Sequence, residues 1–323
     1  MRVLVTGGAG FIGHHLVRRL LADGDEVRVI DDLSTGYAWR IEPVLDQIHY
    51  VRGSILDPAA LDEAAAGCDV ILHEAAIPSV ARSVLEPRAT SAVNVDGTIE
   101  VMLAAARNGV RRLVFAGSSS IYGIPESLPC RETLLPGPQS PYGAAKIAGE
   151  HYINTLGALN GIETVILRYF NVFGPGQDPA SEYAAVVPKF VTAALTGERP
   201  TINGDGSVSR DFTYVDNVVE ANMLAARVPV SGPLTCNVAC GTRYSLLELI
   251  QAIGDALGEP IDPIFGPPRV GDILHSQADI TRAREALGYA MIVPFGEGIA
   301  RTVAWYREQA SAAPADPRPP AAA

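Results

Sequence analysis

Residues 2–13 of this 323-residue chain read RVLVTGGAGFIG. The opening β-branched run predicts a short strand, and Gly7, Gly10 and Gly13 predict a tight turn feeding a helix of 3.6-residue apolar period. A second strand follows and ends at Asp31, roughly 20 residues after the last glycine. Glycines at this spacing let a pyrophosphate approach the helix N-terminus, and the acidic residue accepts hydrogen bonds from the adenosine ribose. The stretch therefore predicts a dinucleotide-binding turn.

Asp31 also bears on which dinucleotide is bound. Its carboxylate can accept from both hydroxyls of the adenosine ribose, whereas it would repel the 2′-phosphate of NADP. We therefore expect NAD as the cofactor.

A second motif reads YGAAK and runs from Tyr142 to Lys146. Ser140 and the proline after it are typical of a helix start, so the tyrosine and the lysine share one helical face. A phenol titrates near ~10 in water, and an adjacent ammonium together with an oxidised nicotinamide would lower its pKa. With Ser118 at the end of a preceding strand, the motif predicts a tyrosine that acts as acid and base.

Short strands alternate with helices through the first half of the chain. Strands are expected at 48–51, 70–73, 112–116 and 164–167, and helices at 93–107 and 142–159. This alternation predicts an α/β fold with a Rossmann-type doubly wound parallel sheet. We assign residues 1–171 to an NAD-binding domain, to which the chain returns around 211–240. We assign 172–310 to a smaller α/β substrate-binding domain with glycine- and proline-rich turns, and 311–323 to a disordered tail.

Composition and charge exclude several classes of partner. The net charge of −11 and the pI of about 5.0 argue against nucleic acid and anionic membranes. No apolar run reaches the ~18 residues of a membrane span, so we expect a cytoplasmic protein. The four cysteines lack metal-like spacing and the six histidines form no ligand cluster, so we expect reduced thiols and no metal.

Further motifs give the chain a family likeness. In chain order they are VTGGAGFIG, HEAA, SSSIYG, YGAAK, RYFNVFGP, SRDFTYVDN and RVGDILHSQAD. Over about residues 1–310 the chain resembles the extended short-chain dehydrogenase/reductases, and among them the UDP-hexose 4-epimerases. The resemblance implies an NAD-dependent isomerase of nucleotide-sugar metabolism and polysaccharide biosynthesis, with a UDP-sugar as substrate.

The resemblance also implies roles for the motif residues. At the Tyr142 position the family removes the proton from the sugar 4-hydroxyl while hydride passes to the nicotinamide. The Ser118 position hydrogen-bonds the same oxygen, and the Lys146 position bridges the nicotinamide ribose. The 4-keto sugar then turns about its diphosphate and takes the hydride back on its other face. UDP-glucose and UDP-galactose would interconvert without net oxidation.

Binding residues follow from the same resemblance. Those that would bind NAD are Gly7, Gly10, Phe11, Ile12, Gly13, Asp31, Asp32, Ser54, Ile55, Ala75, Ala76, Asn94, Tyr142, Lys146 and Tyr169. Those that would bind the nucleotide sugar are Ser79, Ser118, Ser119, Asn171, Gln177, Val187, Lys189, Arg210, Arg269, Asp272 and Ser276. Within this second set, Asn171, Arg210 and Arg269 match diphosphate contacts, and Asp272 matches the acceptor for the uridine ribose.

One position bears on the identity of the sugar. Where a bulky aromatic residue excludes N-acetyl sugars in the family, this chain carries Ser276. Gln177 also matches the branch that handles N-acetylhexosamines, whereas Pro78 could narrow the pocket. We therefore expect use of UDP-hexoses with and without a 2-acetamido group. A UDP-glucuronate 4-epimerase is an alternative. Such an enzyme needs a cation to bind the C6 carboxylate, and the negative charge of Asp178 in that region argues against it.

Two residues depart from or fall outside the family pattern. Ser54 replaces an aspartate that accepts from the adenine amine, so we expect adenine recognition weaker by about 1 kcal/mol, the scale of one hydrogen bond. Glu74 precedes two cofactor-lining alanines, and we expect it to pair with an arginine such as Arg82 and to have no catalytic role.

Two other functions stay open. Nucleotide-sugar dehydratases and decarboxylases are lyases that share the scaffold, but dehydratases carry Asp-Glu where this chain has Ser119 and Ser120, whose hydroxyls serve poorly as acid and base. A non-catalytic NAD-binding sensor or scaffold would typically lack the tyrosine and the lysine. We also expect a homodimer, because the YGAAK helix carries small residues and its counterpart pairs between subunits in relatives.

Overall fold

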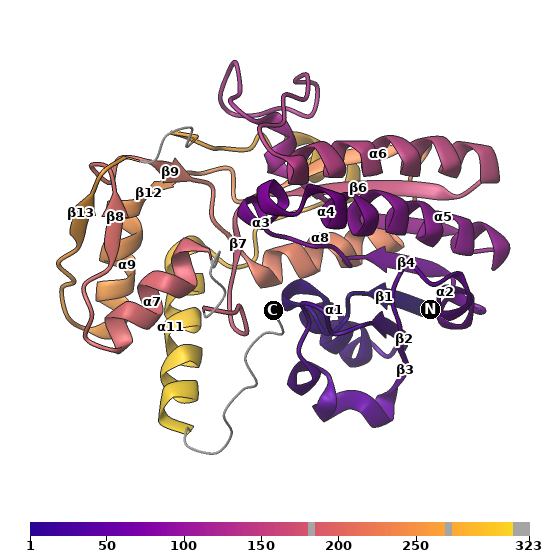
Figure 1. The fold of residues 1–323 in the computed structure, drawn as a ribbon, viewed down its shortest axis with the longest axis horizontal. Coiled ribbons are helices and arrows are strands. Elements are labelled where there is room, and N and C mark those ends of the chain that lie inside the picture. Colours follow the sequence, from indigo (N-terminus) through magenta and orange to yellow (C-terminus); the bar gives the residue numbers. More distant parts are fainter. Residues whose placement is uncertain (180–184, 269–272, 313–323) are drawn as a thin grey trace.

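A parallel sheet lies at the centre of the computed structural model, which describes residues 1–179, 185–268 and 273–312. Its seven strands follow the order β11-β6-β5-β4-β1-β2-β3 (Figure 1). All neighbouring pairs in it are parallel. The strands are β1 (Arg2–Thr6), β2 (Glu26–Asp31), β3 (Ile48–Arg52), β4 (Val70–His73), β5 (Arg112–Ser118), β6 (Glu163–Tyr169) and β11 (Leu234–Val238). The predicted α/β class and Rossmann-type sheet are confirmed.

Helices cover both faces of this sheet. Along β1, Val3 and Val5 face one apolar core and Leu4 faces the other, because successive side chains of a strand point to opposite faces. The helices on the Val3 side are α1 (Phe11–Ala22) and α8 (Val215–Arg227), and those on the Leu4 side are α2 (Pro58–Ala65), α5 (Gly97–Arg107) and α6 (Pro141–Asn160). This double burial explains why the strands are apolar along their whole length.

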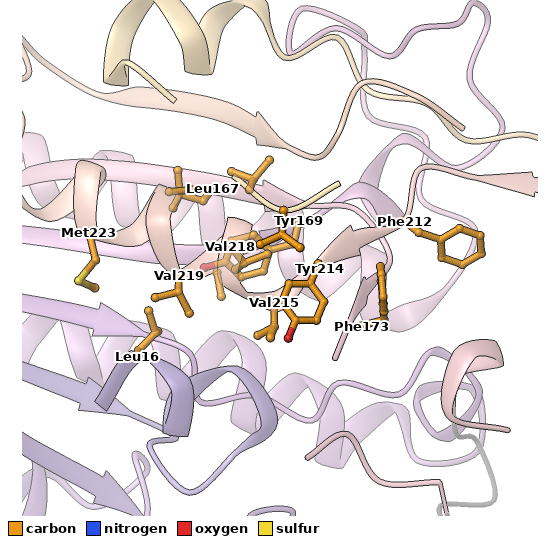
Figure 2. Packing of buried hydrophobic residues seen from close by; sticks show 14 of the residues in the cluster. Leu16, Leu167, Tyr169, Phe173, Phe212, Tyr214, Val215, Val218, Val219 and Met223 are labelled. Atoms are coloured by element: carbon orange, nitrogen blue, oxygen red, sulfur yellow. The ribbon is translucent and has the colours of Figure 1, made fainter. Parts of the chain in front are cut away.

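The core on the α8 side extends beyond the sheet. Leu16 of α1, Leu167 of β6 and Val218 of α8 meet there, all fully buried (Figure 2). The same cluster continues through Phe173 and Phe212, whose ring centroids are 6.4 Å apart in an edge-to-face arrangement. One apolar core thus joins the large sheet to the segment that follows it.

Smaller elements lie beside the sheet in the second half of the chain. Three short ribbons pair β7 (Val172–Phe173) with β10 (Thr213–Tyr214), β9 (Ser209–Arg210) with β12 (Tyr244–Ser245), and β8 (Thr201–Asn203) with β13 (Ile264–Gly266). The helices of this half besides α8 are α7 (Val186–Leu195), α9 (Leu246–Leu257), α10 (Thr281–Leu287) and α11 (Phe295–Ala312). Between these elements α8 and β11 rejoin the large sheet (Figure 1). The division into two domains at residue 171 stays a prediction.

Two predicted helices differ in detail from the structure. The segment expected as one helix at 93–107 is helical throughout but changes type. Ala92–Asp96 form a π-helical turn, and the α-helix α5 begins only at Gly97. The catalytic helix α6 ends at Asn160, close to the predicted Leu159, since Gly161 has a φ of 69° and closes it in the left-handed conformation. Short helices that complete the fold are α3 (Val80–Leu85), α4 (Pro87–Ser91) and the 3-10 turns Ala38–Arg40, Glu42–Gln47 and Ser119–Tyr122.

The C-terminal helix also alters the predicted tail. α11 reaches Ala312, so residues 311–312 are helical, and the rest of the predicted tail lies outside the described residues. Within the described ranges, no helix is both long enough and apolar enough to span a membrane. The four cysteines are free thiols, three of them buried.

Candidate active site

The glycine-rich turn between β1 and α1 is held by its own backbone. The Gly7 N–H donates to the carbonyl of Ile30 at 2.8 Å, and the Gly10 N–H donates to the carbonyl of Gly7 at 3.0 Å. A Cβ on Gly13 would lie 2.1 Å from the Gly7 oxygen, and a Cβ on Gly7 would lie 2.8 Å from Ala75 Cα. The turn therefore excludes side chains and presents the N-terminus of α1 to an anion.

Asp31 lies beside this turn at the carboxyl end of β2. Its side chain accepts from the N–H groups of Ala9 at 2.9 Å and Leu33 at 2.8 Å, and burial raises the pKa of its carboxyl group. The neighbouring Asp32 accepts instead from the Ser34 N–H at 2.9 Å. Asp31 is thus oriented where dinucleotide folds bind an adenosine ribose.

The predicted adenine contacts follow β3 at the same edge of the sheet. Asp31 and Arg52 are in register, so the residues after both strands lie at one end. Ser54 Oγ accepts a backbone N–H two residues further on at 3.3 Å. Ile55 is buried and packs against Gly97, the first residue of α5. Both residues therefore border the region next to Asp31.

These features together fit an NAD molecule. The turn leaves space for a pyrophosphate against backbone atoms, and Phe11 and Ile12 open the helix beside it. Gly36 leaves room next to the Asp31 carboxylate, since a Cβ there would lie 2.9 Å from Oδ1. Within the part of the chain that the structure describes, no group of three or more His, Cys, Asp and Glu residues could hold a metal ion.

The predicted catalytic tyrosine stands on the first turn of α6. Ser140 caps this helix by accepting from the Gly143 N–H at 3.1 Å, and a proline occupies the first position. The Tyr142 N–H donates to Ser83 Oγ at 3.1 Å, and the Tyr142 hydroxyl is near enough to Ser118 for this serine to lower its pKa. The serine at the end of β5 and the tyrosine at the start of α6 therefore meet.

Lys146 lies one turn after Tyr142 and is only 3% exposed. Its Nζ donates to the carbonyl of Ala116 at 2.8 Å and lies 4.8 Å from the ring centroid of Phe115 and 5.9 Å from that of Tyr142. Burial lowers the pKa of Lys146 to about 8 and raises the pKa of Tyr142 to about 12. Burial has the largest effect on the phenol pKa among the protein's own groups. The predicted lowering depends on the ammonium together with an oxidised nicotinamide, and it stays a prediction.

A chain of buried polar groups fixes the end of β4. Thr6 Oγ1 lies 2.7 Å from His73 Nδ1, and Thr98 Oγ1 lies 3.0 Å from His73 Nε2. Because the Thr98 hydroxyl donates to the carbonyl of Asn94 at 2.9 Å, it accepts from Nε2–H, and Nδ1 is left to accept from Thr6. The imidazole is therefore neutral, in agreement with burial that lowers its pKa to about 3.

Asn94 uses its side chain on the loop that follows β4. Its amide oxygen accepts from the Ile77 N–H at 2.8 Å, and its amide nitrogen donates to the Ile77 carbonyl at 3.0 Å. The sequence predicted that Asn94 lines the cofactor directly. In the structure these two bonds hold the loop that carries Ala75 and Ala76, and a direct contact of Asn94 with the cofactor stays a prediction.

Glu74 does not pair with Arg82, contrary to the prediction. The Arg82 Nε donates to Glu86 at 2.9 Å on its own short helix. Glu74 instead accepts from the hydroxyl of Tyr169, the last residue of β6, at 2.7 Å. The sheet order is the reason, because β4 and β6 flank β5 and end at the same edge.

A cavity of about 380 Å³ opens between these residues and the C-terminal elements. Its lining begins at Ile12 of α1, passes Ser118 and Tyr142, and ends at Arg210 and Ser276 on the opposite side. This volume is typical of small-molecule sites. Residues predicted for the cofactor, the chemistry and the substrate therefore share one cavity.

The lining of this cavity includes part of the predicted substrate set. These residues are Ser118, Ser119, Asn171, Arg210 and Ser276. Asn171 has a φ of 35°, a left-handed conformation that asparagine adopts more readily than most residues other than glycine. Its amide donates to the carbonyl of Asp211 at 3.1 Å, and the Arg210 guanidinium donates to two backbone carbonyls, at 3.0 and 3.3 Å.

Four other residues of the predicted substrate set do not line the cavity. Gln177 donates its amide to the Val172 carbonyl at 3.2 Å, and Ser79 caps α3. Val187 is 2% exposed, because it lies on the face of α7 that packs into the apolar core. The fourth, Lys189, is exposed on α7. Arg269 and Asp272 lie outside the described residues, so their predicted contacts stay predictions.

The cavity also contains residues that sequence reasoning missed. His275 lines it and lies 2.8 Å from Ser209 Oγ through Nδ1. Tyr122 lines it as well, with its hydroxyl donating to Asn237 at 2.6 Å. His275 directly precedes Ser276 in the last motif, which is a usable signal. Tyr122 likewise belongs to the quoted motif SSSIYG, although its partner Asn237 comes from a strand more than 100 positions later in the chain.

The chain is similar to known proteins over nearly its whole length. Residues 3–239 match the NAD dependent epimerase/dehydratase family. A UDP-glucose 4-epimerase of Mycolicibacterium smegmatis is 44% identical over 314 residues, 96% of this chain and 99% of that protein. The solved UDP-N-acetylglucosamine 4-epimerase from Methanobrevibacter ruminantium M1, in complex with UDP-N-acetylmuramic acid, has a TM-score of 0.91 and 38% identity, covering 95% of this chain and 98% of that one. The Thermus thermophilus UDP-glucose 4-epimerase, in complex with NAD, has a TM-score of 0.85 and 38% identity, covering 95% and 99%.

The match includes both motifs on which the sequence prediction depends, the glycine turn and the segment from Tyr142 to Lys146. The predicted NAD cofactor and an enzyme of the epimerase type are thereby confirmed. With its parallel sheet, its glycine turn and its buried tyrosine and lysine, the chain belongs to the NAD dependent epimerase/dehydratase family.

Proposed function

We propose that this protein is an NAD-dependent 4-epimerase of UDP-hexoses, acting on UDP-glucose and UDP-galactose and also on their 2-acetamido counterparts. The observation that carries the proposal is that Tyr142 and Ser118 both line the cavity, with the Lys146 Nζ 5.9 Å from the centroid of the tyrosine ring. An alcohol placed in this cavity would meet a base and a hydroxyl donor together.

The catalytic roles follow from this geometry. Bound NAD supplies a hydride acceptor that later returns the same hydride to the sugar. Tyr142 takes the proton of the sugar 4-hydroxyl, and Ser118 donates a hydrogen bond to the same oxygen as it becomes a carbonyl. Once the keto sugar has turned, Tyr142 gives the proton back. Because one residue works in both directions, no external acid or base is needed.

Because the pKa of Tyr142 is raised, the charges around its ring must favour phenolate before it can act as a base. With a value of about 12 in the protein alone, almost all of the phenol is protonated at neutral pH. The positive charges of Lys146 and of oxidised nicotinamide both favour phenolate. Tyr142 therefore gains its strength as a base only when the cofactor is present, which couples proton removal to the oxidised state of the enzyme.

Two residues that line the cavity bear on the acceptance of 2-acetamido sugars, one in favour and one against. Ser276 lines the cavity with a small side chain, and its N–H donates to the Ser209 carbonyl at 3.1 Å, which fixes the loop. Pro78 lines the cavity as well, and its ring counts against the larger sugars. We give the greater weight to Ser276, because it occupies the position at which an aromatic side chain excludes N-acetyl sugars in the family.

Rival activities are less well supported. Of the described residues lining the cavity, Arg210 is the one lysine or arginine, and a uronate epimerase would need a further cation for the C6 carboxylate. For a dehydratase, Ser119 and Ser120 offer hydroxyls where an acid and a base are required, and the Ser120 hydroxyl is already donated to Ser118 at 2.9 Å. A silent sensor would have no use for a buried lysine behind a tyrosine.

The purified protein provides the test of this proposal. It is incubated with UDP-galactose, UDP-N-acetylgalactosamine and UDP-glucuronate in turn, with no added coenzyme, and the products are separated. Conversion of the first two to their C4 epimers supports the proposal. Exchange of UDP-glucuronate alone, or formation of a 4-keto-6-deoxy sugar, would replace it with a rival activity.

We also propose a homodimer that pairs α5 and α6 between subunits. The two helices lie side by side in Figure 1, and Tyr152 of α6 is 45% exposed. Ala145 and Gly149 are buried, Gly149 against Phe115, so part of the small-residue pattern serves packing onto the sheet. A single species of monomer mass in sedimentation at micromolar concentration would contradict the dimer.

A further inference from the structure

Glu74 belongs to a hydrogen-bonded group that the proposed mechanism does not use. It lies directly after β4, and its Oε1 accepts from the Tyr169 hydroxyl at 2.7 Å. Asn222 of α8 donates its amide N–H to the same hydroxyl oxygen at 2.8 Å. Since that oxygen already receives a proton from Asn222, the phenol hydrogen is directed to Glu74. The carboxylate is therefore held in one place by residues from two other elements.

The surroundings of this carboxylate distinguish it from the other buried glutamate near Lys146. Glu150 is paired with the Arg168 guanidinium at 2.7 Å, so its negative charge is balanced locally. The hydrogen-bond partner of Glu74 is a neutral phenol instead. Burial raises the pKa of Glu74 to about 7, while Tyr169 and the ammonium of Lys146 lower it.

The register of the sheet places Glu74 close to the catalytic pair. Glu74 follows His73, which pairs with Phe115, and the Lys146 Nζ donates to the carbonyl of the next residue of β5, Ala116, at 2.8 Å. Its charge raises the pKa of both Lys146 and Tyr142. The groups around it are Thr6 from β1, neutral His73 from β4, Tyr169 from β6, the catalytic tyrosine and lysine from α6, and Asn222 from α8. Among these, Lys146 carries the one positive charge that Glu74 can balance.

We propose, on the basis of the epimerase function above, that Glu74 is a positioning residue whose negative charge sets the proton affinities of Tyr142 and Lys146, and so places the pH range in which the pair works. As a carboxylate it keeps Lys146 charged and opposes phenolate at Tyr142. When it is neutral, both effects disappear, and Tyr142 and Lys146 lose their protons at lower pH.

A purely structural role would not require a carboxylate at this position. A glutamine has the same shape and can accept the same hydrogen bond from Tyr169 through its amide oxygen. Burying it would also avoid the desolvation of a charge. The substitution Glu74→Gln therefore removes the charge while keeping the contact, and separates the two roles.

The first experiment is the pH dependence of kcat/KM for UDP-galactose in wild type, Glu74→Gln and the control Glu308→Gln, which removes an exposed charge on α11. Loss of the Glu74 charge makes phenolate easier to form and ammonium easier to lose. Both limbs of the profile should therefore move to lower pH by roughly one unit, the scale of a nearby charge. The control should keep the wild-type profile.

Tyr169→Phe supplies a second variant, which protects the test if Glu74→Gln fails to fold. It removes the donor that favours the carboxylate, so Glu74 stays neutral to higher pH and the profile moves in the same direction by a smaller amount. If both variants fold and lower kcat or thermal stability while the limbs stay at their wild-type pH, Glu74 is structural and the proposal is wrong.

A spectroscopic titration makes the inference separable from the proposed function. Phenolate absorbance of the NAD-loaded protein is followed with pH, and the same titration of Tyr142→Phe is subtracted to isolate one tyrosine. The Tyr142 transition should fall to lower pH in Glu74→Gln without any substrate present. A shifted transition in a protein that fails to epimerise any UDP-sugar would uphold this inference and reject the function. If the Tyr142 transition is unshifted in Glu74→Gln while the protein is an active epimerase, the inference about Glu74 is wrong and the proposed function is upheld.

Discussion

The two ends of the cavity are built in different ways. At the catalytic end, Ser118 terminates a long strand of the sheet and Tyr142 and Lys146 stand on α6, a 20-residue helix. At the substrate end, Arg210 belongs to a two-residue strand and Ser276 to a loop that bonds to it. Regular elements fix the position of the chemical groups, while short ribbons and loops shape the part that selects the sugar. Changes at the first end should therefore abolish the reaction, and changes at the second should redirect it.

The largest effect is expected for Tyr142→Phe. Loss of the hydroxyl removes the acid and base, so kcat/KM should fall by roughly 10²–10⁴. The thermal midpoint should stay near that of wild type, because the ring is kept and Ser118 retains the Ser120 hydroxyl as a partner. Tyr152→Phe on the exposed face of the same helix is the control. A substantial residual rate in Tyr142→Phe would show that the base lies elsewhere.

Arg210→Met is expected to have the next largest effect. If its guanidinium contacts the diphosphate, KM for UDP-galactose should rise roughly tenfold or more, with a smaller change in kcat. Arg199→Met is the matched control, since Arg199 forms an exposed pair with Asp262. Steady-state kinetics of both variants provide the test. If Arg210→Met leaves KM unchanged, or if both variants raise KM equally, Arg210 does not bind the diphosphate.

Ser276→Tyr should redirect the enzyme without stopping it. The added ring fills space beside the sugar, so turnover of UDP-N-acetylgalactosamine should fall roughly tenfold relative to UDP-galactose, as expected for a clash in a close-packed pocket. Ser276→Ala, which adds no bulk, should leave the ratio near its wild-type value. An equal loss of both substrates in the tyrosine variant would mean that Ser276 does not border the 2-substituent.

The smallest effect is expected at the adenine end, for Ser54→Asp. A charged acceptor in place of the hydroxyl should tighten NAD binding by about 1 kcal/mol, the scale of one hydrogen bond. Titration calorimetry on protein stripped of cofactor measures the change, and Ser54→Asn controls for size without charge. Weaker binding of NAD to the aspartate variant would show that Ser54 does not face the adenine.

The catalytic end could be predicted from the sequence because its signals are local. The glycine turn and the Tyr142–Lys146 spacing each lie within a few residues, and a helix start or a strand–turn–helix brings them together without reference to the rest of the fold. Even there, spacing does not reveal burial, which has the largest effect on the phenol pKa among the protein's own groups.

What escaped prediction depends on contacts between distant segments. Glu74 was matched with a nearby arginine, whereas its partner Tyr169 arrives from β6, 95 positions later in the chain. Val187 lies in a segment that resembles a substrate-binding one, but the orientation of α7 directs its side chain into the apolar core. His275 entered the cavity through the pairing of its loop with β9. Sheet order and helix rotation decide such contacts, and a short motif contains neither.

The central claim is that Tyr142 and bound NAD oxidise and then reduce the same carbon within one turnover. The measurement that tests it most directly uses UDP-galactose with deuterium at C4, followed by mass analysis and NMR of the UDP-glucose formed in ordinary water. We predict that the deuterium remains at C4, because the hydride that leaves is the one that returns. Product that has exchanged this deuterium for solvent hydrogen would contradict the account.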